Sequence, residues 1–313
     1  MTPVTEVELD GRDLKKALEG AKLHIERHID EVNLLNVFPV PDGDTGINMF
    51  LTMKSAMEAT EKADDSFAGV VAASAAKGAL LGARGNSGVI LSQILRGMAK
   101  GLEGKQSFSC ADFAYALHIA SEQAYKVMEK PVEGTILTVI REASEEASRV
   151  IEKRTSFVRA LSAIVLRAKK TVEKTPEMLP VLKEAGVVDA GAKGLYYFFK
   201  GMESSICRKP SQTRSGKISS GTASAAKREE RVYGFDVQFL LEGEDLPIEE
   251  IKRKVVSSGE CPLVVGDEKL LKVHVHTKNP DEILDYARSK GTIKNVVVED
   301  MDLQVQKRLG SEP

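Results

Sequence analysis

Cysteine is scarce in this chain of 313 residues, which contains only Cys110, Cys207 and Cys261. The three lie far apart and none belongs to a CxxC pair, so the sequence argues against a disulfide framework and predicts the reduced thiols of a cytoplasmic protein. The N-terminus also lacks the basic start and apolar run of a signal peptide. We therefore expect a cytoplasmic protein.

Long hydrophobic runs and an excess of one charge sign are absent as well. No stretch has the roughly 20 apolar residues that a membrane span requires. The 44 Lys and Arg residues nearly balance the 46 Asp and Glu residues, so no strong field predicts binding to nucleic acid or to a membrane. Binding of small charged ligands and formation of a homodimer are both compatible with this composition.

Apolar residues recur with helical spacing up to about residue 206, and no convincing strand interrupts them. The sequence therefore predicts an all-α domain over residues 1–206, a bundle or barrel of seven or eight helices. The predicted helices include 14–32, 68–81, 109–128, 156–173 and 176–185, and a last helix that opens at Asp189.

A change of composition and of period divides the chain after this helical part. Residues 207–230 are rich in Ser, Lys, Arg, Gly and Thr, which is typical of a flexible linker. Over 231–313 the apolar residues alternate, which predicts a smaller α/β domain. The expected order is strand 235–241, helix 247–258, strands 262–265 and 271–276, helix 280–290 and strand 293–298. This βαββαβ order predicts a ferredoxin-like sandwich.

Two acidic residues stand in a glycine-bracketed turn at residues 36–49 (NVFPVPDGDTGINM), directly before an apolar helix. Carboxylates at a helix start suit Mg²⁺ and the phosphates that it carries, so Asp42 and Asp44 are candidate metal ligands. Capping of the helix by one of them is the alternative. A second glycine-rich stretch, residues 82–88, lacks the spacing of a Walker loop or a dinucleotide fingerprint. It is either a tight turn or an anion site.

A second candidate metal site arises from strand alternation. His274 and His276 project together from the face opposite the core, and Asp236 projects from the non-core face of its own strand. If the two strands are neighbours, the three side chains form a cluster suited to Zn²⁺. The alternative is a pair of exposed histidines on a solvated sheet face.

Four motifs in order carry a resemblance to a known family. They are residues 36–49, residues 82–93 (GARGNSGVILSQ), residues 131–139 (PVEGTILTV) and residues 189–195 (DAGAKGL). Together they resemble the nucleotide-binding domain of dihydroxyacetone kinases, and most closely its version in bacterial fatty acid kinases. Residues 232–301, with Val-His-Val-His-Thr at 273–277, resemble the middle domain of those same fatty acid kinases.

This resemblance implies an eight-helix barrel that binds ATP and two Mg²⁺ ions at its mouth. Asp42 and Asp44 would hold the metals, and Asn36 lies near the place of a further metal-binding Asp in dihydroxyacetone kinases. The implied nucleotide contacts are Thr45, Gly46, Asn48, Asn86, Ser87 and Gly88 on the phosphates, Thr135 beside the nucleotide, and Asp189 and Gly191 on its sugar or base side.

The activity implied is transfer of the γ-phosphate to a fatty acid that a separate carrier protein of the DegV type presents, giving an acyl phosphate. The alternatives are one component of a dihydroxyacetone kinase-like phosphotransferase and a non-catalytic nucleotide-binding scaffold. Fatty acid kinases usually continue into a third domain, whereas this chain ends at Pro313. A separate polypeptide is then expected to supply that domain, unless the acceptor differs.

One departure from the family pattern concerns the second metal site. The family commonly places a cysteine in the first strand of the middle domain, where it joins the two histidines. This chain has Asp236 there. Because a carboxylate is a harder ligand than a thiolate, the identity of the metal stays open.

Overall fold

The computed structural model describes residues 8–151, 156–206 and 232–310. The predicted linker, 207–230, lies outside these ranges.

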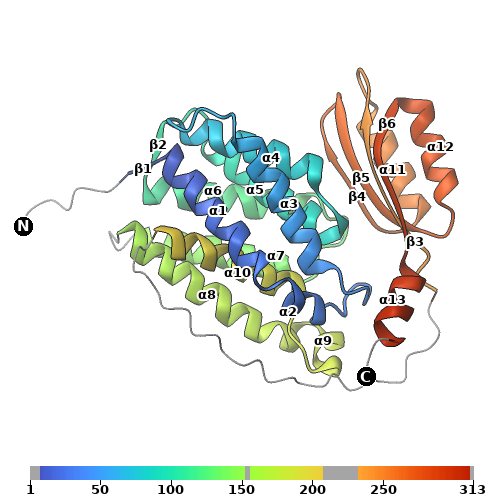
Figure 1. Cartoon of the computed structure of the whole chain (residues 1–313), viewed down its shortest axis with the longest axis horizontal. Helices are drawn as coiled ribbons and strands as arrows, with labels where there is room; N and C mark the ends of the chain where they lie inside the picture. The colour runs from blue at the N-terminus through green and yellow to red at the C-terminus, as the bar shows by residue number, and fades with distance from the viewer. Residues whose placement is uncertain (1–7, 152–155, 207–231, 311–313) are drawn as a thin grey trace, which may run out of the picture.

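Eight long helices of the described part form a closed ring, in which each packs against the next (Figure 1). The order around the ring is α1, α3, α4, α5, α6, α7, α8 and α10, and α10 returns to α1. This ring confirms the all-α prediction for the N-terminal part. The bounds are α1 (Gly11–Glu26), α3 (Thr45–Thr60), α4 (Ala68–Gly82), α5 (Gly85–Gly101), α6 (Cys110–Lys126), α7 (Ile136–Ile151), α8 (Phe157–Met178) and α10 (Ala190–Ile206). Two short paired strands, β1 (Leu9–Asp10) and β2 (Ser107–Phe108), precede α1 and α6.

Small residues allow α5 and α6 to approach closely. A Cβ atom added at Gly97 would lie 2.3 Å from the Cα of Ala120, and one added at Gly101 would lie 2.4 Å from the Cα of Ala116. Side chains cannot be accommodated at such distances, so the two helices meet backbone to backbone. This contact fixes the position of α5, whose N-terminus faces the candidate site.

The helix predicted over residues 14–32 is wrong as a single element, since α1 ends at Glu26. The ring nitrogen Nδ1 of His28 contacts the carbonyl oxygen of His24 at 2.7 Å. That carbonyl is the acceptor that the backbone N–H of His28 would use in a continuous α-helix. A separate short helix, α2 (Ile29–Leu34), follows.

The helix predicted over residues 176–185 is also wrong in its bounds. The helix α8 continues through Pro176, which has no N–H to donate to the carbonyl of Val172. The hydroxyl of Thr175 donates to that carbonyl instead, at 2.8 Å. The helix therefore tolerates the proline, and the next helix, α9 (Pro180–Ala185), begins at the second proline.

The C-terminal part is a four-stranded antiparallel sheet with the strand order β4-β5-β3-β6. Its helices α11 and α12 lie on the side of the sheet away from the barrel (Figure 1). The order of elements confirms the ferredoxin-like prediction, and a final helix, α13, was not predicted. The bounds are β3 (Phe235–Glu242), α11 (Ile248–Ser258), β4 (Glu260–Gly266), β5 (Leu270–Thr277), α12 (Pro280–Lys290), β6 (Thr292–Asp300) and α13 (Met301–Gly310).

Both faces of the central strands β3 and β5 are buried. Val237 and Val275 belong to the core beneath α11 and α12. Asp236 and His274, on the opposite face, are only 5% and 0% exposed. The alternative of exposed histidines on a solvated sheet face is therefore wrong.

The barrel covers this second face of the sheet. Leu263 and Val265 of β4 pack with Ala83 and Val89, which lie at and beyond the turn between α4 and α5. This apolar contact between the two parts brings the polar side chains of β3 and β5 against the barrel mouth.

Candidate functional site

The acidic turn does not cap its own helix through Asp44. Although Asp44 stands at the N-cap position of α3, its side chain forms no capping hydrogen bond. Asn33 of α2 takes that role, since its Oδ1 accepts the N–H of Gly46 at 2.7 Å and that of Ile47 at 3.3 Å. Asp44 accepts the side-chain amide of Asn48 at 2.7 Å. The capping alternative is thus wrong for Asp44, which keeps coordination capacity for a ligand.

Two half-buried carboxylates close together make this turn strongly electronegative. Burial raises the pKa of Asp42, although hydrogen bonds from its neighbours, including the side-chain amide of Asn36, oppose the rise. Burial raises the pKa of Asp44 well above its ordinary value, and the charge of Asp42 raises it further. Asp236 from the second domain adds to both shifts. A divalent cation would relieve this repulsion, and oxygen ligands of this kind fit Mg²⁺.

A cavity of about 500 Å³ lies between the barrel mouth and the second domain. Most of the residues predicted for the site line it, although they come from six separate segments of the chain. Those lining residues are Asn36, Asp42, Asp44, Thr45, Asn86, Ser87, Thr135, Asp189, Gly191, Asp236 and His276.

Four other predicted residues do not line the cavity: Gly46, Asn48, Gly88 and His274. The N–H of Gly46 donates a hydrogen bond to Asn33, and the side-chain amide of Asn48 donates one to Asp44. A Cβ atom at Gly88 would lie 2.4 Å from the hydroxyl oxygen of Thr52. These residues therefore stand one layer behind the cavity and support it.

Asp189 caps the helix that begins beside the cavity. Its Oδ1 accepts the N–H of Ala192 at 2.7 Å, and its own N–H donates to the hydroxyl of Thr175 at 3.0 Å. Burial raises the pKa of Asp189 to about 7, although backbone N–H groups, including that of Gly191, stabilise the charged form. The carboxylate is thus held in one orientation at the edge of the cavity.

The Asp/His/His cluster predicted from strand alternation is present. In the sheet, Asp236 pairs with His276 across β3 and β5, and Gln238 pairs with His274. The potential ligand atoms of Asp236, His274 and His276 all lie within 4.8 Å of one another. Burial lowers the pKa of His276 to about 3, so its imidazole is neutral, as a metal ligand must be.

Several polar atoms of this region are buried without a hydrogen-bond partner. Both ring nitrogens of His274, one carboxylate oxygen of Asp236 and the side-chain oxygen of Asn86 are in this state. His274 Nδ1 lies 3.0 Å from Asp236 Oδ1, close but without the alignment of a hydrogen bond. Because unpaired buried polar atoms are costly, they favour a ligand: a metal ion at the cluster and a polar ligand at Asn86.

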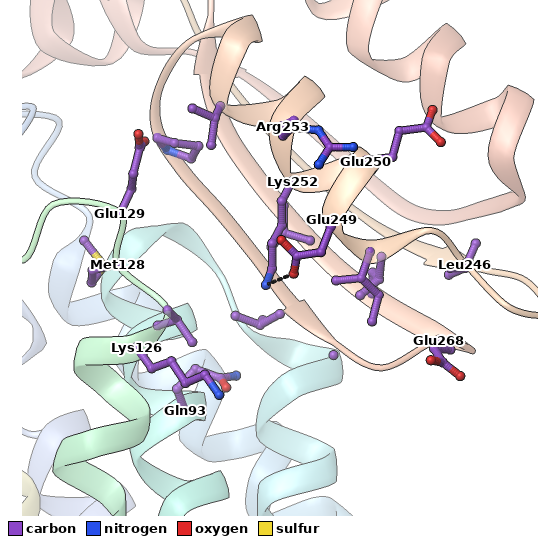
Figure 2. Close-up of a pocket in the computed structure, with 18 of the residues that line it drawn as sticks. Gln93, Lys126, Met128, Glu129, Leu246, Glu249, Glu250, Lys252, Arg253 and Glu268 are labelled. Atoms are coloured by element: carbon purple, nitrogen blue, oxygen red, sulfur yellow. Dashed lines mark hydrogen bonds and ion pairs between the residues drawn. The ribbon is translucent and has the colours of Figure 1, made fainter.

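A second cavity, of about 890 Å³, adjoins the first between the barrel and α11 (Figure 2). Lys126 lies on its barrel side, whereas Glu249, Lys252 and Arg253 lie on the side of the second domain. The two cavities share the lining residues Met128, Glu129, Val256 and Pro262. The first cavity therefore opens into a groove along the boundary between the two parts of the chain.

Sequence reasoning missed two residues that contact the site loops. Gln238 shares its strand face with Asp236, so the alternation of β3 already placed it beside the cluster. Arg308 belongs to α13, for which no pattern was recognised, and it contacts the loop that carries Asp42. No signal local to residue 308 could have found this contact.

Comparison with protein families follows this division of the chain. The family described as DAK2 domain matches residues 39–204, more than half of the chain. The chain belongs to the DAK2 domain family. A second family, described as the middle domain of FakA-like fatty acid kinase proteins, matches residues 232–308 of this DAK2-domain protein. The two matches make it a kinase-related protein of the dihydroxyacetone kinase and fatty acid kinase family.

Similar proteins occur in species of Bacillus and Staphylococcus. Protein YloV of Bacillus subtilis (strain 168) is 37% identical over an alignment of 307 residues, which covers 94% of this chain and 56% of the relative. Uncharacterized proteins of Staphylococcus saprophyticus and Staphylococcus epidermidis are both 35% identical, over 94% and 91% of this chain and 55% and 53% of their own lengths. The DAK2-domain protein thus spans about half the length of these relatives.

None of the described helices combines the length and the apolar character of a membrane span.

Proposed function

We propose that this DAK2-domain protein is an ATP- and Mg²⁺-dependent phosphotransferase, and that its acceptor is a fatty acid presented by a separate carrier protein of the DegV type. The pair of half-buried, mutually repelling carboxylates at Asp42 and Asp44 is the observation that carries the proposal. Such a pair is costly without a cation. The cavity beside it also contains Asn86, Thr135 and Asp189.

In this proposal Asp42 and Asp44 hold Mg²⁺, with Asn36 fixing the orientation of Asp42. The bound ion would neutralise charge on the phosphates of ATP. Asn86 and Ser87, at the N-terminus of α5, contact phosphate oxygens, because N–H groups and the helix dipole favour anions there. Thr135 and Asp189 contact the nucleoside part.

Phosphoryl transfer then requires little covalent chemistry from the protein. A carboxylate oxygen of the fatty acid attacks the γ-phosphorus, the bond from that phosphorus to the β,γ-bridging oxygen breaks, and ADP leaves. The products are an acyl phosphate and ADP, and no proton needs to be removed from an ionised carboxylate. Positioning and charge neutralisation are therefore the contributions expected of this site.

The adjoining groove supports the idea of a presented acceptor. It joins the cavity at Met128 and Pro262, so a partner seated along it would reach the nucleotide site from the boundary of the two parts. We further propose that Asp236, His274 and His276 bind Zn²⁺ or a similar ion in the second domain.

Transfer of labelled γ-phosphate from ATP tests the proposal. We expect label in an acyl phosphate when Mg²⁺ and a purified fatty-acid carrier loaded with fatty acid are both present, and none with Asp42→Ala. Asp281→Ala, which removes an exposed carboxylate of α12, is the matched control and should retain activity.

Other outcomes separate the alternatives. Transfer of the labelled phosphate to a triose-type carbonyl substrate, and not to the fatty acid, would show that the carbonyl substrate is the acceptor. Tight binding of ATP with no transfer to any acceptor would favour a nucleotide-binding scaffold. Full activity of Asp42→Ala would contradict the metal assignment.

A further inference from the structure

The turn before α5 is held by a side chain of the second domain. The N–H of Gly85 donates to Oε1 of Gln238 at 3.0 Å, although 153 residues separate the two in the sequence. Gln238 is 2% exposed. Its Nε2 donates to Asp236 Oδ2 at 2.7 Å, so both ends of the amide are engaged and its orientation is determined. Gln238 therefore links the turn at Gly85, which precedes the proposed phosphate contacts Asn86 and Ser87, to the Asp/His/His cluster.

The loop of the acidic pair is held by another side chain of the second domain. The guanidinium of Arg308 donates to the carbonyl of Leu34 at 2.9 Å and to that of Pro41 at 3.1 Å. It also donates to the carbonyl of Asn36. Three backbone carbonyls that precede Asp42 thus share one planar, permanently charged group.

The aliphatic part of Arg308 makes this contact still closer. A Cβ atom at Gly43 would lie 3.2 Å from the Cδ of Arg308, so the side chain passes directly over the glycine between the two aspartates. Gly43 has a φ of +78°, a conformation that other residues rarely adopt. The arginine therefore covers the backbone of the acidic turn as well as bonding to carbonyls that precede it.

Two other contacts between the two parts form no hydrogen bond with the backbone of these loops. Arg96 donates to the carbonyl of Gly266 at 3.3 Å, and Leu263 and Val265 pack with the apolar residues near α5. Such contacts hold the second domain in place. Gln238 and Arg308 differ from them because they bond directly to the backbone of the turn and the loop that line the cavity.

We propose that the second domain completes the nucleotide site through two positioning residues. Gln238 positions the turn at Gly85, and Arg308 positions the loop that carries Asp42 and Asp44. This inference rests on the proposed function. Catalytic groups on loops need a fixed geometry, and neighbouring hydrogen bonds supply it. The barrel provides the groups that contact ATP and Mg²⁺, whereas the second domain keeps them in place.

The two residues should fail in different ways. Arg308→Met frees the loop of Asp42 and Asp44, so the gain in ATP affinity on adding Mg²⁺ should fall about tenfold. Gln238→Leu frees the Gly85 turn, so ATP affinity should fall about tenfold both with and without Mg²⁺. Arg308→Lys keeps the positive charge but loses the planar set of guanidinium N–H donors. Its gain in ATP affinity on adding Mg²⁺ should therefore lie between those of wild type and Arg308→Met.

Arg96→Met is the matched control, because it removes a cationic side chain that crosses the same boundary without touching a site loop. We would titrate ATP, with and without Mg²⁺, into each full-length variant by calorimetry and compare their melting temperatures. The inference would be overturned if Gln238→Leu and Arg308→Met bound ATP, with and without Mg²⁺, as tightly as Arg96→Met does.

Hydrogen exchange of the protein without nucleotide separates this inference from the proposed function. We expect Arg308→Met to accelerate exchange within residues 34–44 and Gln238→Leu within residues 85–88, each by at least about tenfold relative to Arg96→Met. Unchanged exchange in both segments would contradict the inference even if the wild type binds Mg²⁺ and ATP. Accelerated exchange in a protein that does not bind ATP would reject the proposed function and leave the two contacts as structural.

Discussion

The barrel mouth holds two half-buried carboxylates and the sheet of the second domain holds a buried one, and their pKa values are shifted in opposite directions. Burial and mutual repulsion raise the pKa values of Asp42 and Asp44. Burial disfavours the charged form of Asp236 as well, but its interactions with His274 and His276 and the hydrogen bond from Gln238 outweigh this effect, so its pKa is lowered. Burial alone therefore does not decide the charge of a buried acid. Its neighbours do.

The comparison also distinguishes what each site needs. The acidic pair needs positive charge from outside the protein, whereas the Asp/His/His cluster offers a mixed oxygen and nitrogen donor set. The first suits Mg²⁺ with phosphates, and the second suits Zn²⁺ or a similar ion. Four predictions test this contrast.

The largest effect is expected from Asp44→Asn, which removes one charge of the pair while keeping nearly the same shape. Phosphoryl transfer should fall more than about 100-fold, because the site loses charge that positions the cation and the phosphates. Turnover with carrier-bound fatty acid is the measurement. Asp281→Asn is the control, and equal turnover of the two variants would contradict the role of the pair.

A pH-dependent effect is expected at Asp189. Its pKa of about 7 in the folded protein exceeds the value of 3.8 in the unfolded chain, so the folded state binds the proton more tightly. The stabilising contribution of the protonated form is complete below about pH 4 and is lost as the pH rises through about 7.

Asp189→Asn removes this titration. The free energy of unfolding of the variant relative to wild type should therefore increase between about pH 4 and pH 8, by on the order of 2–4 kcal/mol. Urea denaturation across this range measures it. A difference that does not vary with pH would show that the carboxyl stays charged in the folded protein.

Zinc should stabilise the protein through the cluster of the second domain. A ligand at about 100 times its dissociation constant contributes about 2.7 kcal/mol, which raises the melting temperature by a few degrees. His274→Ala should abolish the shift, and His118→Ala, at an exposed histidine of α6, should retain it. An unchanged melting temperature of the wild type on adding zinc, together with no zinc in elemental analysis, would contradict the proposed zinc site.

The smallest effect concerns the residue that caps the helix of the acidic turn. Asn33→Ala should cost about 1 kcal/mol of stability, because two N–H groups at the start of α3 lose their acceptor. Asn279 precedes α12 without a capping side-chain hydrogen bond, so Asn279→Ala should cost less. Denaturation of both variants decides whether Asn33 is the cap.

Much of the fold could be predicted because the helices and strands of this chain have regular apolar periods. Alternation in β3 and β5 correctly placed Asp236, His274 and His276 on one face, and helical spacing predicted an all-α bundle or barrel. Errors arose where side chains intervened in backbone hydrogen bonding. His28 ends a helix through the carbonyl of His24, and Thr175 lets α8 continue through Pro176.

The sequence by itself determined which residues form the acidic turn, which side chains share a strand face, and where the helical period gives way to alternation. Each of these properties depends on residues that are near one another in the chain. Only the tertiary structure decided that the polar face of the sheet is buried against the barrel mouth, and that Gln238 and Arg308 hold its loops. The contact of Arg308 with the loop of Asp42 spans 267 residues between Pro41 and the arginine. Because a local pattern carries no information about such separations, packing of the two parts had to establish them.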